Sequence, residues 1–299
     1  MNDLITIYQQ HFRLEEATFL RIEHDEAMVA AVYKIILPNQ STRLLKICSR
    51  SEDYFREVYY LRRLASLIPI ARLIDKIPPT SDTPGAVLMG YIPGELLKKG
   101  KASENLAYEI GLALAKIHQN RTEKYGDPTQ PQTLITTPAV PFLLKFEEGL
   151  TECHAHLPKK ILSQTQHFLD AHIHLLSSID GPCIIHRDFR PGNIITFKNK
   201  LQGIIDWASA RFGFAEEDFC SLELGEWSTT FDVKKAFLAG YASIRPVPNY
   251  QPIIRLLHLN RAFATLGFTI KQKTWNSTQS QLYTENRLFL DNFFKPKTS

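Results

Sequence analysis

A polar loop held between two pairs of isoleucines, IIHRDFRPGNII at 184–195, limits how this part of the chain can fold. The isoleucine pairs indicate short buried strands on both sides, and Pro191 and Gly192 favour a turn between them. Asp188 and Asn193 therefore lie in a short loop with both ends fixed in the interior. Either residue alone is readily explained as a loop residue that caps a turn, but the pattern H-R-D-x-x-x-x-N indicates a functional site.

A second apolar run, GIIDWA, places Asp206 directly after another expected strand. We expect Asp188, Asn193 and Asp206 to approach one point, where they would offer two carboxylates and an amide oxygen. Oxygen ligands of this kind suit Mg²⁺, which also binds the phosphate oxygens of substrates. A carboxylate that is not on the metal could orient a hydroxyl nucleophile, so the set predicts phosphoryl transfer.

The pattern of apolar residues divides the chain into two parts of different character. Segments rich in apolar and β-branched residues predict strands at 17–24, 28–37, 42–49, 71–77 and 86–92, and a helix begins at Ser51 after the third strand. Later, helical periodicity predicts a helix capped by Ser103 and others at 159–178, 233–243 and 252–272, an irregular connection at 126–141, and short strand pairs near 184 and 203. We place the boundary so that the two parts are 1–91 and 92–299.

Composition excludes several other classes of protein. The formal net charge is +4, and no run of Lys or Arg exceeds two residues, so we expect no nucleic-acid partner. The N-terminus lacks the pattern of a signal peptide, and no stretch of 18 apolar residues exists, so we expect no membrane partner and a cytoplasmic location. The four cysteines form no CxxC pair, which argues against a zinc or redox site and favours free thiols.

The sequence leaves the oligomeric state open, and the chain could be a monomer or a homodimer.

HRDFRPGN and IIDW resemble the catalytic and metal-binding loops of the protein-kinase-like superfamily, more specifically its aminoglycoside phosphotransferase and choline kinase branch. The resemblance implies an α+β, bilobal fold, with a small antiparallel β-rich lobe that holds one helix and a larger, mostly helical lobe. It also implies ATP and Mg²⁺ as cofactors. In this branch Asp188 would orient the substrate hydroxyl or accept its proton, and Asn193 and Asp206 would bind Mg²⁺.

The resemblance extends upstream. Lys46 in RLLKICS and Glu57 in YFREVYYL match the lysine–glutamate pair that holds the α- and β-phosphates in this superfamily. VLMGYIPGE matches the hinge between the lobes. Met89 would then lie at the back of the adenine pocket, and Gly90 and Ile92 would offer backbone groups to the adenine edge. Lys46 alone would be read as a solvated charge at a strand end.

Two departures from the superfamily pattern concern the phosphates. The segment IEHDEAM, where a glycine-bearing loop usually covers the phosphates, has no glycine and carries two adjacent acids, Asp25 and Glu26. Arg190 replaces the histidine or lysine that more often follows the catalytic aspartate by two residues. Because a guanidinium can grip phosphate oxygens, we predict that Arg190 contacts the transferring phosphate. The alternative is a structural ion pair with a nearby acid.

The acceptor is predicted to be a small molecule. Asp206 and Asp218, which resembles the structural aspartate of the family, lie only 12 residues apart, and no APE-like sequence appears, which argues against a protein kinase. Residues 206–232 hold seven carboxylates and one arginine, a formal balance of −6 that would suit an amine-bearing substrate. Candidate contacts are Glu216, Glu217, Glu223, Glu226 and Trp227, the last as a cation–π face.

Other interpretations stay open at this point. The acids of this segment could equally start helices or face water. Family resemblance also allows neutral sugars and homoserine-like amino acids as acceptors. A catalytically silent nucleotide-binding protein of the same fold would explain the missing glycine loop, and an atypical protein kinase is a further alternative.

Overall fold

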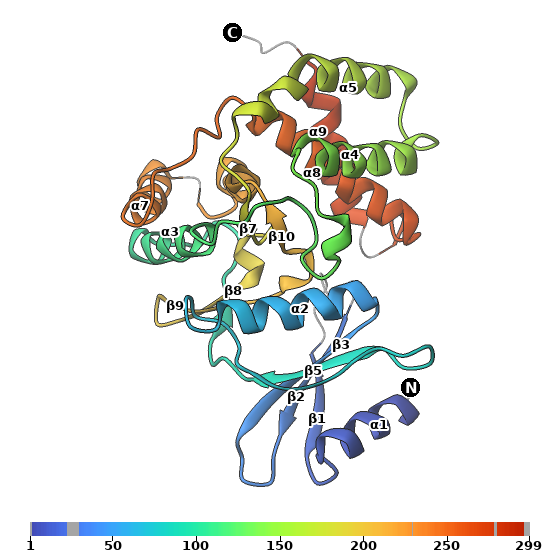
Figure 1. Ribbon diagram of the computed structural model, residues 1–299, viewed down its shortest axis with the longest axis vertical. Helices are drawn as coiled ribbons and strands as arrows, with labels where there is room; N and C mark the ends of the chain where they lie inside the picture. The colour runs from blue at the N-terminus through green and yellow to red at the C-terminus, as the bar shows by residue number, and fades with distance from the viewer. Residues whose placement is uncertain (1, 23–29, 229, 278–279, 296–299) are drawn as a thin grey trace.

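Five antiparallel strands form the sheet of the N-terminal part of the computed structural model (Figure 1), which describes residues 2–22, 30–228, 230–277 and 280–295. In the order β1-β2-β3-β5-β4, they are β1 (Thr18–Ile22), β2 (Ala30–Ile36), β3 (Thr42–Cys48), β5 (Gly85–Gly90) and β4 (Leu73–Ile77). The five predicted strands are therefore confirmed, except that the portions within 23–29 lie outside the described residues.

Different helices cover the two faces of this sheet. They are α1 (Asn2–Phe12) and α2 (Ser51–Leu64). Because side chains alternate along a strand, Leu45 packs with Tyr8 of α1, whereas its neighbour Lys46 points to the opposite face. On that face Val87 belongs to the same apolar cluster as Tyr54 of α2. The alternation therefore directs Lys46 toward α2 and the C-terminal part.

The C-terminal part is mostly helical, as predicted, and it also holds two small sheets. Its helices are α3 (Glu104–His118), α4 (Ala139–Cys153), α5 (Lys159–His172), α6 (Cys220–Glu223), α7 (Phe231–Ala242), α8 (Ile254–Lys271) and α9 (Ser280–Phe293). Its sheets pair β7 (Cys183–Ile185) with β10 (Arg211–Gly213), and β6 (Glu95–Leu96) with β8 (Ile194–Phe197) and β9 (Lys200–Ile204). The α+β, two-part fold is confirmed, whereas the exact division at 91 stays a prediction.

Local sequence explains where several of these helices begin. Ser103 caps α3 as predicted, because its Oγ accepts a hydrogen bond from the Leu106 N–H at 3.3 Å. The segment 126–141 is mostly irregular, but α4 already begins at Ala139, where Pro141 fits the first turn because its N–H is not needed there. The sequence patterns above predict none of α1, α4 and α9.

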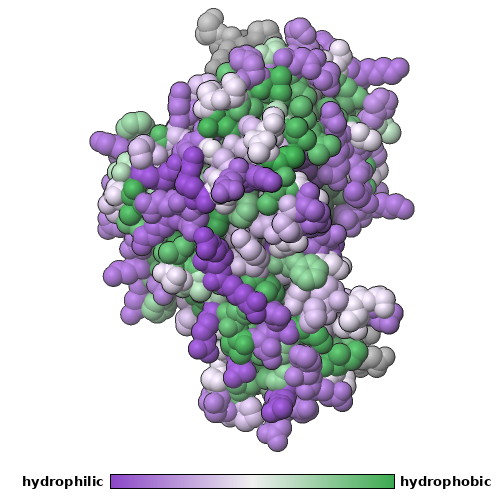
Figure 2. Space-filling view, in the orientation of Figure 1, coloured by the Kyte–Doolittle hydropathy of each residue, from purple (hydrophilic) through white to green (hydrophobic). Residues whose placement is uncertain are grey.

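The helices α3 and α7 pack closely against each other. A methyl group on Gly111 of α3 would come within 2.0 Å of the Phe237 carbonyl oxygen on α7, and one on Gly240 within 2.0 Å of the Tyr108 carbonyl oxygen. Only glycine permits the two backbones to pack this closely. Figure 2 shows a band of hydrophilic side chains crossing the face where the sheet-bearing part meets the helical part.

No helix in the described part of the chain is both long and apolar enough to cross a membrane. All four cysteines are buried and free, as expected.

Candidate active site

Lys46 links the sheet to the two acids that face it. Its Nζ donates hydrogen bonds to Glu57 Oε2 on α2 and to Asp206 Oδ1 beyond β9, each at 2.8 Å. Burial disfavours the ammonium, but the carboxylates of Asp206 and Glu57 outweigh it and raise the pKa of Lys46 above its usual value. Lys46 in turn lowers the pKa of Asp206 against the effect of burial. The amine and Asp206 are therefore both charged at neutral pH.

The helix α2 is tied directly to the loop after Asp206. Glu57 Oε2 also accepts a hydrogen bond from the Trp207 N–H at 3.0 Å. The neighbouring Arg56 donates to the Ala208 carbonyl at 3.2 Å and to Asp127 Oδ2 at 2.6 Å. The position of α2 therefore sets the geometry of Lys46 and of the 206–208 loop together.

Asp206 adopts an unusual backbone conformation. Its φ of 65° and ψ of 73° place it in the left-handed region, which is uncommon for a residue other than glycine. The side chain is 43% exposed, although one oxygen is engaged by Lys46. Such strained residues persist where the surrounding structure holds them, and they cluster at functional sites.

Asp188 and Asn193 form the second half of the site. Asn193 Nδ2 donates to the Asp188 backbone carbonyl at 2.8 Å and to Asp188 Oδ2 at 2.7 Å. Because both partners are acceptors, the orientation of the amide is defined, and its oxygen is the atom that could coordinate a cation. The Ile205 N–H donates to the Asn193 carbonyl at 3.0 Å, which brings Asp206 beside this loop.

Arg190 lies against the carboxylate of Asp188. Its Nε is 3.1 Å from Oδ1 and 3.2 Å from Oδ2 of Asp188, whose side chain is 36% exposed. The ion pair that was the alternative for Arg190 therefore exists in this structure. A contact of Arg190 with a transferring phosphate stays a prediction.

The loop is held from behind by a buried network. Asp218 accepts hydrogen bonds from the backbone N–H groups of His186 at 2.8 Å and Arg187 at 2.6 Å. Its Oδ2 also lies 3.0 Å from His118 Nε2, and His118 Nδ1 lies 2.8 Å from the Tyr241 hydroxyl. Burial lowers the pKa of His118, so a neutral ring would donate to Asp218 and accept from Tyr241. The structural place predicted for Asp218 matches these contacts.

His118 and Tyr241 were not among the predicted residues. Each lies near the C-terminal end of a segment whose apolar periodicity predicts only a helix. One polar residue on such a helix face is a weak indication of a functional role. Only the packing of α3 on α7 brings them to Asp218.

The hinge residues lie at the end of β5. Met89 is buried at 6% exposure, on the face that carries Lys46. The Gly90 N–H already donates to the Arg72 carbonyl at 2.8 Å, so only its carbonyl could serve an adenine ring. Ile92 packs beside Gly203 of β9. Adenine contacts of these residues stay predictions.

The structure corrects two predicted substrate residues. Trp227 is 1% exposed and packs on Phe189 and Phe237, with ring centroids 5.4 and 5.8 Å apart, so it cannot present a face to a substrate. Glu216 is 2% exposed, and its Oε1 accepts a hydrogen bond from the Asp180 N–H at 2.9 Å. Both predictions are wrong because these side chains belong to the interior.

The other predicted substrate acids have cationic partners from outside the segment 206–232. Glu217 lies 3.6 Å from Arg187, Glu223 lies 2.6 Å from Lys234, and Glu226 lies 2.8 Å from Arg261. The −6 balance of this segment is therefore largely neutralised in the fold. A role of these three acids in substrate binding stays a prediction.

Comparison with known proteins assigns the family. Residues 25–250, more than half of the chain, match the phosphotransferase enzyme family known as APH. The chain belongs to this family. The predicted resemblance to the aminoglycoside phosphotransferase branch is thereby confirmed.

Two curated relatives of this family member are homoserine kinases. The protein from Rhizobium meliloti (strain 1021) is 28% identical over 229 residues, and that from Sinorhizobium medicae (strain WSM419) is 27% identical over 227 residues. Each match covers 73% of this chain and 65% of the relative. The chain thus spans just under two thirds of the length of these relatives.

Solved structures of aminoglycoside phosphotransferases share the fold. The GDP and kanamycin complex of APH(2")-IIia has a TM-score of 0.72 at 14% identity and covers 97% of both chains. A thermostable mutant of APH(4)-Ia with ADP and hygromycin B has a TM-score of 0.69 at 12% identity and covers 98% of both chains. At these identities the likeness shows the fold alone.

Proposed function

We propose that this phosphotransferase family member transfers the γ-phosphate of ATP, with Mg²⁺, to a hydroxyl of a small molecule. The observation that carries the proposal is the direct contact of Lys46 with both Glu57 and Asp206, at 2.8 Å each, beside the Asp188–Asn193 loop. The ammonium of Lys46, held by these two carboxylates, could position the phosphates of a nucleotide. Phosphoryl transfer depends mainly on such positioning and on charge neutralisation.

The donor set fits Mg²⁺. Asp206 uses Oδ1 for Lys46, which leaves Oδ2 as a ligand, and Asn193 is oriented by Asp188 so that its amide oxygen is left. Two protein oxygens suit an ion that takes its other ligands from water and substrate phosphates. When bound, the ion would neutralise phosphate charge during transfer.

Each remaining residue has a distinct task in this proposal. Lys46, held by Glu57, would bind the α- and β-phosphates. Asp188 is partly exposed and would orient the acceptor hydroxyl or take its proton as the bond to phosphorus forms. The glycine-free segment 22–28 lies almost entirely outside the described residues, so its part in binding phosphates stays a prediction.

The acceptor is proposed to carry an amine as well as a hydroxyl. The curated relatives are named for homoserine, an amino acid with a terminal hydroxyl, and neighbouring structures contain kanamycin and hygromycin B. All three compounds bear amines. The proposal therefore rests on these relatives, since Glu217, Glu223 and Glu226 of the acidic segment are paired with cationic side chains from outside it.

Two alternatives are disfavoured by particular contacts. A silent nucleotide-binding protein would not need the carboxylate of Asp188, which Asn193 holds in place. A protein kinase needs a platform for a peptide, but between Asp206 and Asp218 the chain forms two 3₁₀ turns and the paired strand β10, with Phe214 and Ala215 buried. This leaves little extended chain at the site.

The test is release of ADP from ATP–Mg²⁺ across a panel that includes L-homoserine, kanamycin, choline and glucose. We expect turnover with an amine-bearing acceptor that requires Asp188. Tight ATP binding without turnover of any acceptor would instead support the silent protein.

A further inference from the structure

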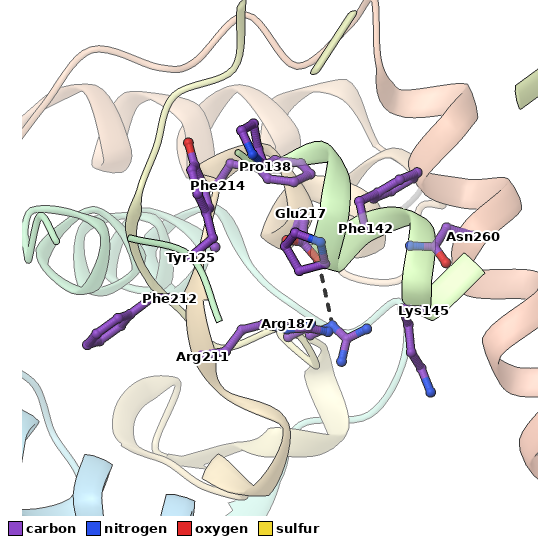
Figure 3. A pocket seen from close by; sticks show the side chains of 12 residues that line it. Tyr125, Pro138, Phe142, Lys145, Arg187, Arg211, Phe212, Phe214, Glu217 and Asn260 are labelled. Carbon is purple, nitrogen blue, oxygen red and sulfur yellow. Dashed lines mark ion pairs between the residues drawn. The ribbon is translucent and has the colours of Figure 1, made fainter. Parts of the chain in front are cut away.

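A small cavity next to the catalytic loop is lined by more cationic than anionic side chains. It has a volume of about 10 Å³ and lies between β10, α4, α8 and the loop that precedes Asp188. Arg187, Arg211 and Lys145 line it together with a single carboxylate, Glu217 (Figure 3). Lys145 is already paired with Glu148 on its own helix, at 2.6 Å. Two arginines therefore face one acid.

The guanidinium of Arg211 has hydrogen-bond donors without partners in the described part of this cavity. Its Nε and Nη2 atoms are buried and have no hydrogen-bond partner among the described residues. Guanidinium donors without partners in the interior are costly, because the water they have lost is not replaced. The arrangement points to a ligand that accepts hydrogen bonds and carries negative charge.

Asn260 adds a second polar group to the same wall. It is 8% exposed and lines the cavity, and its Oδ1 is also buried without a hydrogen-bond partner in the described structure. A buried amide with an unused oxygen is unexpected where packing alone shapes a wall. The cavity is therefore lined by buried polar groups without partners among the described residues, beside the apolar side chains of Pro138 and Phe142. Because an amide oxygen only accepts hydrogen bonds, the groups that could bind an anion here are the arginines.

Arg187 is held there at a conformational cost. Its φ of 68° lies in the left-handed region, where glycine would be unstrained. A large side chain at such a position leaves the backbone strained. Among the described residues, the acidic side chain within ion-pair distance of Arg187 is Glu217, at a long 3.6 Å. Burial accordingly lowers the pKa of Arg187, and Glu217 only partly offsets this.

We propose that this cavity is a carboxylate-binding subsite for the acceptor, with Arg211 and Arg187 as the groups that recognise it. The subsite rests on the proposed function in one respect only, namely that the bound molecule is the phosphate acceptor. Arg187 lines the cavity and directly precedes Asp188, so the cavity adjoins the loop that carries the residue proposed to orient the hydroxyl. The acceptor class is then a hydroxy acid or hydroxy amino acid.

The size of the cavity limits what enters it. A space of about 10 Å³ admits roughly one water-sized atom, so one carboxylate oxygen would enter while the rest of the molecule stays outside. The side chains of Arg187 and Lys145 are 24% and 33% exposed, so the cavity meets solvent on their side. That oxygen could accept hydrogen bonds from Nε and Nη2 of Arg211, which have no partner among the described residues.

Three matched compounds separate the carboxylate from the amine. L-Homoserine carries both groups, 4-hydroxybutanoate lacks the amine, and 3-aminopropan-1-ol lacks the carboxylate. Binding to the full chain is measured by calorimetry at constant ionic strength. We expect Arg211→Gln to weaken L-homoserine and 4-hydroxybutanoate at least tenfold and to leave 3-aminopropan-1-ol unchanged. Equal affinities of both carboxylates for wild type and variant would overturn the proposal.

Two controls keep the result interpretable. Arg63→Ala removes an exposed arginine of α2 and should change none of the three affinities. Arg211→Lys keeps the charge but loses the planar fork, so it should recover part of the binding if Arg211→Gln proves poorly folded by thermal unfolding. Full binding of both carboxylates by folded Arg211→Gln and Arg211→Lys would contradict a role for the guanidinium.

Acetate and turnover distinguish the subsite from the proposed function. If acetate binds in an Arg211-dependent manner but does not compete with L-homoserine, the site holds a separate ion and the acceptor assignment is overturned. If carboxylates bind through Arg211 but no compound yields ADP, the subsite stands and the proposed phosphoryl transfer fails. If L-homoserine is turned over, Arg211→Gln should raise its KM at least tenfold.

Discussion

Asn193 donates its side-chain amide to two acceptors of Asp188, the backbone carbonyl at 2.8 Å and Oδ2 at 2.7 Å. The loop thereby fixes the carboxylate through a residue five positions later. The same two bonds point the Asn193 oxygen away from Asp188. The amide nitrogen of Asn193 thus holds the Asp188 carboxylate, which is proposed to orient the hydroxyl. The amide oxygen of the same side chain points elsewhere and is proposed to bind Mg²⁺.

Asp188→Asn should lower kcat by orders of magnitude and leave the KM for ATP nearly unchanged. A group that orients the nucleophile acts in the transition state more than in nucleotide binding. Steady-state kinetics on a confirmed acceptor provide the measurement, with the exposed Asp170→Asn as a matched control. Near-wild-type turnover in Asp188→Asn would remove the catalytic role.

Asp206→Asn should abolish Mg²⁺-dependent turnover. The change removes the charge that faces Lys46 at 2.8 Å and weakens the oxygen proposed to bind the ion. Activity is measured against Mg²⁺ concentration, and Asp82→Asn, at an exposed turn, should behave as wild type. An unchanged Mg²⁺ dependence would refute the metal assignment.

Local motifs predicted much of the site because the motif residues lie close together along the chain. Asp188 and Asn193 share one loop, and Lys46 and Glu57 lie on a strand and the helix that follows it. Their contacts then depend on strand alternation and on one helix position, both of which are readable from sequence.

Charge counting along the chain overestimated the unpaired negative charge of one segment for a physical reason. The segment 206–232 sums to −6, but the cationic partners of its acids, Arg187, Lys234 and Arg261, all lie outside this window. Burial of Trp227 is likewise set by packing against Phe237 of α7. Neither long-range fact has a local signal in the sequence.

Arg190→Ala should lower kcat/KM, with a loss of transition-state stabilisation of roughly 2–4 kcal/mol, if the guanidinium stabilises charge that develops on the phosphate. The observed pair with Asp188, at 3.1 Å, allows a second result. If the pair is only structural, thermal stability should fall while kcat/KM of the folded enzyme stays within about threefold. Kinetics and thermal unfolding on the same preparation decide between these results.

Trp227→Ala should destabilise the fold by about 3–5 kcal/mol, as expected for truncation of a buried aromatic side chain. The indole is 1% exposed and packs against Phe189, next to Asp188. Denaturant unfolding measures the loss, and Trp227→Phe should recover part of it. A selective rise in the KM of a cationic acceptor, without loss of stability, would restore the substrate role that the structure contradicts.

Glu216→Gln should flatten the pH dependence of stability between about pH 4.5 and 7. Burial raises the pKa of Glu216 from 4.5 to about 7, so the folded state binds a proton in this range that the unfolded chain releases. The free energy of unfolding therefore contains a contribution that is complete below pH 4.5 and is lost as the pH rises through about 7. At 1.36 kcal/mol per pKa unit this amounts to roughly 3 kcal/mol. Denaturant unfolding of the wild type and of Glu216→Gln at pH 5 and pH 8 measures this contribution to the free energy of unfolding. Equal slopes with pH in wild type and variant would show that Glu216 ionises normally despite its burial.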